Sequence, residues 1–184
     1  MLIVHKVSLL LLAISAVLVG SQVHASSTNV VTCNQATKTR PDMGVPYNGE
    51  VVNDDYKVVA KIPNGLTAWG GVAPGAPFHG FTIFLDKSLK SCIVFDVHIR
   101  VDDSDAPKRP ESARMLSLGK AESWRQESSA TFKNASVTNI TTRYAYTHDG
   151  ETDDGEILLV TPTKQLSKFV PVYGAFLNSF RVGS

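Results

Sequence analysis

Alternation of side-chain character between residues 93 and 102 is the pattern that most limits how this chain can fold. Because successive side chains of a β-strand point to opposite faces, the alternation predicts a strand with one packed face and one largely polar face. A single strand cannot bury its apolar face alone, so we expect a sheet. The packed face would carry Ile93, Phe95, Val97, Ile99 and Val101, and the other face Val94, Asp96, His98, Arg100 and Asp102.

Four other segments are typical of strands: residues 56–62, 80–85, 135–146 and 156–161. Residues 64–80 contain five glycines and two prolines, which predicts a long loop. Residues 111–126 predict a short helix, because several apolar side chains recur there without strict alternation. The acidic segment between the last two strands predicts a hairpin with a long tip.

Apolar residues recur at helical spacing near the end of the chain and predict an amphipathic helix over residues 170–180. Pro171 fits such a helix only in its first turn, where a missing N–H costs nothing. The elements together predict the α+β class: one domain, mainly an antiparallel sheet packed by this C-terminal helix, with an α/β/α sandwich as one possible arrangement. Residues 56–184 would form this domain, preceded by an irregular lead-in over residues 26–55.

The last strand and helix also resemble a known family. The segments Ile157-Leu158-Leu159-Val160-Thr161 and Tyr173-Gly174-Ala175-Phe176-Leu177-Asn178-Ser179-Phe180-Arg181 are similar to the end of PsbP/Mog1-like domains, over about 25 residues. The resemblance implies an α/β/α sandwich that is usually not enzymatic. It transfers no site residue to this chain.

The first 25 residues are typical of a secretory signal peptide. His5 and Lys6 form a weakly basic start, an apolar run extends from Val7 to Val19, and small residues at Val23 and Ala25 suit cleavage. The run is shorter than the ~18 to 20 apolar residues that cross a bilayer, so an uncleaved anchor is the lesser alternative. The sequence therefore predicts a secreted or periplasmic protein, with no membrane span after cleavage.

The two cysteines, Cys33 and Cys92, lie beyond this leader and predict a disulfide in an oxidising compartment. The bond would hold the lead-in onto the central strand. Two free thiols acting as metal ligands are the alternative, but no CxxC motif or nearby Cys/His pair supports it.

Charge excludes one class of partner. Removal of the leader takes away Lys6 and no other formal charge, which leaves equal numbers of acidic and basic residues. Nucleic-acid binding needs a basic field that displaces phosphate counterions, so no nucleic-acid partner is expected. No cofactor is predicted either.

Candidate chemistry is sparse. Asp96, His98 and Arg100 lie on one strand face, and a carboxylate beside an imidazole is an arrangement that general bases use. A solvated strand face explains the same three residues without catalysis.

Asp149, Glu151 and Asp153 begin an acidic loop that imitates a calcium-binding EF-hand. However, Asp154 stands where the motif needs glycine and Val160 stands where it needs glutamate. A charged hairpin tip that keeps a sheet edge soluble is the ordinary alternative.

Asn134 and Asn139 begin glycosylation sequons, which would be used only if the source is a eukaryote.

Aromatic residues on the long loop suggest a binding role. Trp69, Phe78 and His79 would sit on flexible backbone, where such side chains commonly contact a partner protein. The alternative is that Trp69 and Phe78 fold inward and cover the sheet, as aromatic residues in long loops often do. The sequence favours an exported protein that is not an enzyme, for example an inhibitor or immunity protein that blocks another protein. The alternatives are an envelope accessory protein of PsbP-like type and a small secreted hydrolase that uses His98 and Asp96.

Overall fold

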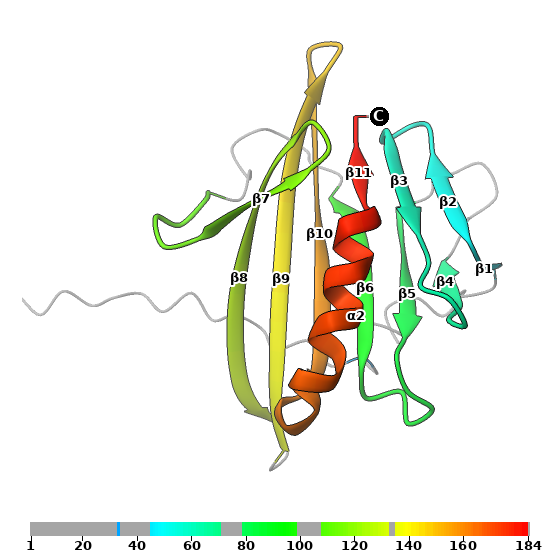
Figure 1. The fold of residues 1–184 in the computed structure, drawn as a ribbon. Coiled ribbons are helices and arrows are strands. Elements are labelled where there is room, and N and C mark those ends of the chain that lie inside the picture. The colour runs from blue at the N-terminus through cyan, green and yellow to red at the C-terminus, as the bar shows by residue number, and fades with distance from the viewer. Residues whose placement is uncertain (1–32, 34–44, 71–78, 99–107, 133–134, 184) are drawn as a thin grey trace, which may run out of the picture.

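The computed structural model describes Cys33 and residues 45–70, 79–98, 108–132 and 135–183. Most of these residues form one antiparallel sheet with eight strands (Figure 1). Their spatial order is β1 (Val45–Tyr47), β4 (Ala68–Gly70), β5 (Gly80–Phe84), β6 (Cys92–His98), β10 (Glu151–Pro162), β9 (Ala135–His148), β8 (Ala121–Phe132) and β7 (Arg114–Leu118).

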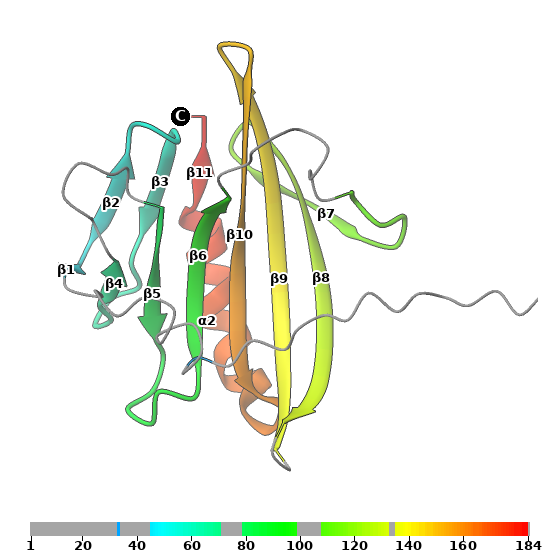
Figure 2. The same cartoon turned by 180° about the vertical axis from the view of Figure 1, so that it is seen from behind.

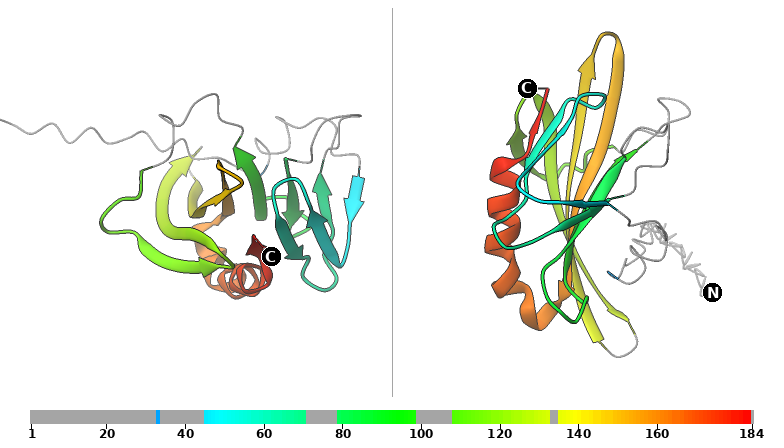
Figure 3. Two further views of the ribbon diagram at one scale, coloured as in Figure 1. Left: turned by 90° about the horizontal axis from the view of Figure 1, so that it is seen from above. Right: turned by 90° about the vertical axis from the view of Figure 1, so that its right-hand side faces the viewer.

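A second, smaller sheet joins three strands in the order β11 (Arg181–Val182), β3 (Val58–Lys61) and β2 (Glu50–Asn53). Helix α2 (Leu166–Ser179) follows a 3-10 turn, η2 (Thr163–Gln165), and lies on one face of the large sheet. Seen from above, the large sheet curves around α2, with β7 and β8 on one side of the helix (Figure 3).

The main core lies between α2 and the sheet and is rich in aromatic rings. Phe95 of β6 contacts Phe81 of β5 and Phe180 just after α2, with ring centroids 5.2 and 5.0 Å apart. All three side chains are fully buried. Since a short helix gains most of its stability from packing, this contact explains why α2 is stable where it lies.

A smaller cluster lies on the opposite face, which Figure 2 shows from behind. It contains the disulfide between Cys33 and Cys92, whose Cα atoms are 5.9 Å apart. The predicted disulfide is therefore confirmed, and it fixes Cys33 to the first residue of β6. Val137, Leu158 and Val160 complete this cluster.

The predicted α+β class is wrong, because strands make up most of the described residues and α2 is the single α-helix among them. The structure is a β-rich fold. Strands were nevertheless expected at the positions of β3, β5, β6, β9 and β10, and the structure has them there.

The helix expected over residues 111–126 is also wrong. This segment forms β7 and the first half of β8, joined by a turn at Gly119 and Lys120. Leu116 and Leu118 share the face that packs toward the core, while Met115 and Ser117, on the other face, are exposed. That alternation is the period of a strand, and Gly119, with a φ of 72°, supplies the left-handed conformation of the turn.

The long acidic tip is corrected to a tight turn. Strands β9 and β10 remain paired up to His148 and Glu151, so only Asp149 and Gly150 form the connection. Both have positive φ, 51° and 86°, which is the conformation of a type I′ hairpin turn. The acidic side chains therefore lie on paired strands and one two-residue turn.

Three boundaries differ from expectation. Strands β1 and β2 lie in the lead-in that was expected to be irregular, and β4 lies in the long loop. Helix α2 begins four residues before the expected start, so Pro171 stands in its second turn. No helix in the described part of the chain is long and apolar enough to cross a membrane.

Candidate functional site

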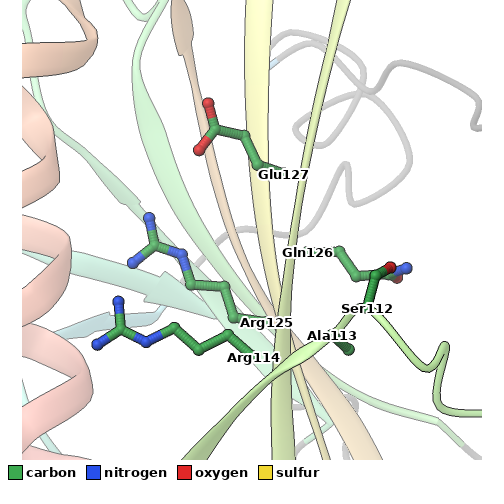
Figure 4. Close-up of a pocket in the computed structure, with 6 residues that line it drawn as sticks. All are labelled: Ser112, Ala113, Arg114, Arg125, Gln126 and Glu127. Carbon is green, nitrogen blue, oxygen red and sulfur yellow. The ribbon is translucent and has the colours of Figure 1, made fainter.

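Two arginines from neighbouring strands form the most distinctive charged feature of the sheet. Arg114 of β7 and Arg125 of β8 are directly opposed in the antiparallel register. Both side chains point to the α2 side, and Figure 4 shows the guanidinium groups next to each other. Like charges at directly opposed positions destabilise a sheet, so the pair is unfavourable for folding alone.

Arg125 is held in place by the helix. Its guanidinium carbon lies 6.0 Å from the ring centroid of Tyr173, a cation–π distance. The Tyr173 hydroxyl donates to the Ile157 carbonyl at 2.7 Å and lies 2.8 Å from the Thr142 hydroxyl. Burial raises the pKa of Tyr173, so the ring stays neutral and rigid beneath the arginine.

A hollow of about 440 Å³ lies around these two arginines (Figure 4). It forms where β7 begins, since β8 continues past Arg125 with β9 on one side and no described strand on the side of β7. Glu127, two residues further along β8, points to the same side as the arginines. The lining residues are Ser112, Ala113, Arg114, Arg125, Gln126 and Glu127.

The ion pairs of the described arginines leave out the two arginines of the hollow. Among the described residues, Arg109 pairs with Glu122 at 3.0 Å and Arg143 pairs with Glu156 at 3.3 Å. Neither Arg114 nor Arg125 has a described carboxylate within ion-pair distance. Within the part of the chain that the structure describes, the hollow therefore presents two guanidinium groups that have no ion-pair partner. Planar guanidinium groups with several N–H donors are suited to binding oxyanions.

This site was not predicted from the sequence, because a helix was expected over residues 111–126. A signal was present nonetheless: a hairpin centred on Gly119 and Lys120 places residues 114 and 125 opposite each other. Leu116 and Leu118 at a spacing of two, followed by a glycine at a turn position, would have predicted that hairpin.

The predicted histidine site lies on the other face of the sheet. The His98 imidazole contacts Asp154 of β10 at 3.1 Å, so the carboxylate beside it comes from the neighbouring strand. Asp154 is 1% exposed and His98 is partly exposed. Asp96 shares the strand with His98, and Arg100 lies outside the described residues. A histidine fixed by a buried carboxylate suits either a general base or a structural pair.

The predicted partner-binding residues are separated from the arginine hollow. Trp69 lies on β4, which pairs with both β1 and β5, so its backbone is part of the sheet. Its side chain is 36% exposed. Nδ1 of His79 lies 2.9 Å from the Tyr56 hydroxyl, which ties it to the small sheet. Phe78 lies outside the described residues.

The predicted metal candidates do not converge. Asp149 and Glu151 are exposed at the β9–β10 turn, and Asp153 binds His148 at 2.7 Å. No group of three histidine, cysteine or acidic residues is placed to hold a metal ion within the described ranges. The hydrogen bond that the His148 imidazole donates to the Asp153 carboxylate, opposed by desolvation, raises the pKa of His148 above its usual value.

The two sequons have different positions. Asn134 lies outside the described residues, whereas Asn139 is on β9 and is 5% exposed. A glycan at Asn139 would have no space in the folded sheet, so this sequon is unsuited to modification.

Comparison with known proteins shows only the fold. No family model and no curated protein matches the chain. The structure is similar to the crystal structure of LpqN, which is involved in cell envelope biogenesis of Mycobacterium tuberculosis. The match has a TM-score of 0.52 at 10% sequence identity and covers 84% of this chain and 98% of the LpqN chain. At this identity it assigns no residue and no activity.

Proposed function

We propose that this chain is an accessory protein of the cell envelope that works outside the cytoplasm by binding rather than by catalysis. The observation that carries the proposal is the hollow at Arg114 and Arg125, where two guanidinium groups that form no ion pair with a described residue lie beside α2. Two like charges at directly opposed positions of a sheet destabilise the fold. A binding role is therefore a better reason than folding for the position of the two arginines.

Two further observations support an envelope location. The Cys33–Cys92 disulfide suits an oxidising compartment, and the leader at residues 1–25 would direct the chain there. The fold is similar to that of LpqN, whose role is in envelope biogenesis. The resemblance to PsbP/Mog1-like domains implies the same kind of non-enzymatic accessory role.

The accessory role is preferred to the inhibitor or immunity role for a structural reason. The inhibitor hypothesis depended on Trp69 and Phe78 on a flexible loop that could enter an enzyme's cleft. Trp69 instead belongs to a strand that is paired on both sides. A residue held in this way is less suited to inserting into another protein.

The hydrolase hypothesis needed His98 as a base, Asp96 as the carboxylate that orients it, and a divalent ion at the acidic loop. Asp149, Glu151 and Asp153 are not gathered around a common point. His98 and Asp154 remain as a pair, but this pair alone does not define a reaction.

The test is cell fractionation of the tagged full-length chain in its own host. We expect the chain in the periplasmic or secreted fraction, shortened by the leader and with neither cysteine able to react with a maleimide reagent. We also expect it to co-purify with envelope material after mild cross-linking. A full-length chain in the cytosol with both thiols reactive would refute the proposal. As a control, a variant that lacks residues 1–25 should stay in the cytosol.

A further inference from the structure

We propose that the hollow at Arg114 and Arg125 binds the phosphate group of an anionic ligand that carries neutral or cationic groups beside that phosphate. This inference rests on the proposed function, because it names the ligand chemistry of the same site. Its evidence is the register of β7 and β8, the contact with Tyr173 and the position of Glu127.

The register sets the spacing of the donors. Because Arg114 and Arg125 are directly opposed, their side chains leave the sheet side by side and reach the same side of it (Figure 4). One oxyanion placed between them would receive N–H donors from both guanidinium groups. Phosphate has enough oxygens to accept from both, and arginine binds such groups in a two-pronged geometry that lysine lacks.

The two arginines have different roles. Arg125 lies over the buried Tyr173 ring and is partly buried, so its position is fixed before a ligand arrives. Arg114 is exposed at the first residue of β7 and completes the site from the open side. A fixed donor lowers the conformational entropy that binding costs.

Glu127 limits the ligand. Its carboxylate points to the same side as the arginines and has no described cation within ion-pair distance. A second negative charge on the ligand near Glu127 would be repelled, whereas a hydroxyl or ammonium group would be attracted. Ser112 and Gln126 also line the hollow, but Figure 4 shows their side chains on the other side of the strands from the arginines.

The volume suits a small headgroup. A hollow of about 440 Å³ falls within the range of small-molecule sites. A phosphate that carries a short polyol or amine has a suitable size. Such groups occur both in free metabolites and in lipid headgroups. Because the two sources share this chemistry, the experiment is designed to distinguish them.

The experiment uses calorimetry to measure the binding of sn-glycerol 3-phosphate and of inorganic phosphate to the chain with its disulfide formed. In parallel, the chain is sedimented with vesicles of phosphatidylcholine alone and with vesicles that also contain phosphatidylglycerol. We expect saturable binding of at least one phosphate probe at one site per chain. Binding of the soluble probes alone identifies a free phosphate ligand, and sedimentation with phosphatidylglycerol vesicles identifies a headgroup. Absence of binding to every probe overturns the inference.

Variants locate the site. Arg114→Gln and Arg125→Gln should each weaken binding about tenfold or more, since each removes charge-assisted hydrogen bonds. Arg114→Lys keeps the charge but loses the two-pronged geometry, so its affinity should lie between those of wild type and Arg114→Gln. Glu127→Gln should tighten binding, which a purely structural role would not produce. Lys87→Gln, at an exposed lysine in the β5–β6 turn, is the matched control and should leave the affinity within about twofold.

Unchanged affinity in both arginine variants, with unchanged thermal unfolding, would overturn the inference. So would equal losses in Lys87→Gln and the arginine variants, because that pattern indicates non-specific attraction. These failures differ from failure of the proposed function. If the chain is exported but its arginine variants keep their affinity for phosphate, only the proposed phosphate site is wrong. If the chain is cytosolic but binds phosphate through Arg114 and Arg125, only the proposed envelope role is wrong.

Discussion

Replacing both cysteines with alanine should lower the free energy of unfolding by about 4 kcal/mol. The bond joins residues separated by 59 positions, and closing a loop of that length in the unfolded chain removes about 14 cal/mol/K of entropy. At room temperature this entropy corresponds to about 4 kcal/mol. Most single domains are stable by only about 5 to 15 kcal/mol, so the variant should be only marginally folded.

Urea unfolding of the wild type and the Cys33→Ala/Cys92→Ala variant measures this loss, with far-UV circular dichroism and tryptophan fluorescence as independent signals. The alanines also remove sulfur atoms from the cluster with Leu158 and Val160, which adds a packing cost. Wild type unfolded in a reductant loses the cross-link but keeps the sulfur atoms. It therefore separates the entropic part from the packing part.

We expect the reduced wild type to lose about 3 to 4 kcal/mol and the alanine variant to lose slightly more. A loss below about 1 kcal/mol in both would refute the reasoning, because the cross-link would then not restrict the unfolded chain. A large loss in the alanine variant together with a small loss on reduction would assign the effect to packing of the buried sulfurs instead.

Two further changes test the face that α2 covers and the end of the hairpin. Tyr173→Phe leaves the Ile157 carbonyl and the Thr142 hydroxyl without their partner in the core, so unfolding in urea should show a loss of about 1 to 3 kcal/mol; an unchanged midpoint would contradict this. The pKa of His148 is raised in the folded state, so protonated His148 stabilises the fold through its bond to Asp153. This contribution is fully present at a pH below the ordinary histidine pKa, and it is lost as the pH rises through the folded-state pKa. The difference in stability between wild type and His148→Gln should therefore be larger at pH 5.5 than at pH 8.5, and a difference independent of pH would refute it.

Local patterns predicted the strands best where alternation was strict and unbroken. Residues 92–98 form β6 because their apolar face packs in the core, as the period of two indicates. The disulfide was predictable for a different reason, since a chain that is expected to be exported and has two cysteines has few other uses for them. Neither inference needed information about distant parts of the chain.

The helix expected over residues 111–126 shows why the class was wrong. Ala113, Met115, Leu116 and Leu118 allow both a helical and a strand period over so short a segment. The sheet decides between them, because β8 pairs with β9 along almost its whole length. Pairing with a distant strand is tertiary information that local propensity does not contain.

The arginine site depends on this pairing even more strongly. A shift of one residue between β7 and β8 would separate Arg114 from Arg125 and turn one of them to the opposite face. The β-turn at Gly119 fixes that register. Strand β11 holds this β-turn in place, since Lys120 donates its backbone N–H to the Val182 carbonyl at 2.9 Å. A Cβ at Gly119 would lie 2.5 Å from the same carbonyl oxygen, so a side chain there would force β11 and the turn apart. The binding residues are therefore positioned by a contact with the last strand of the chain.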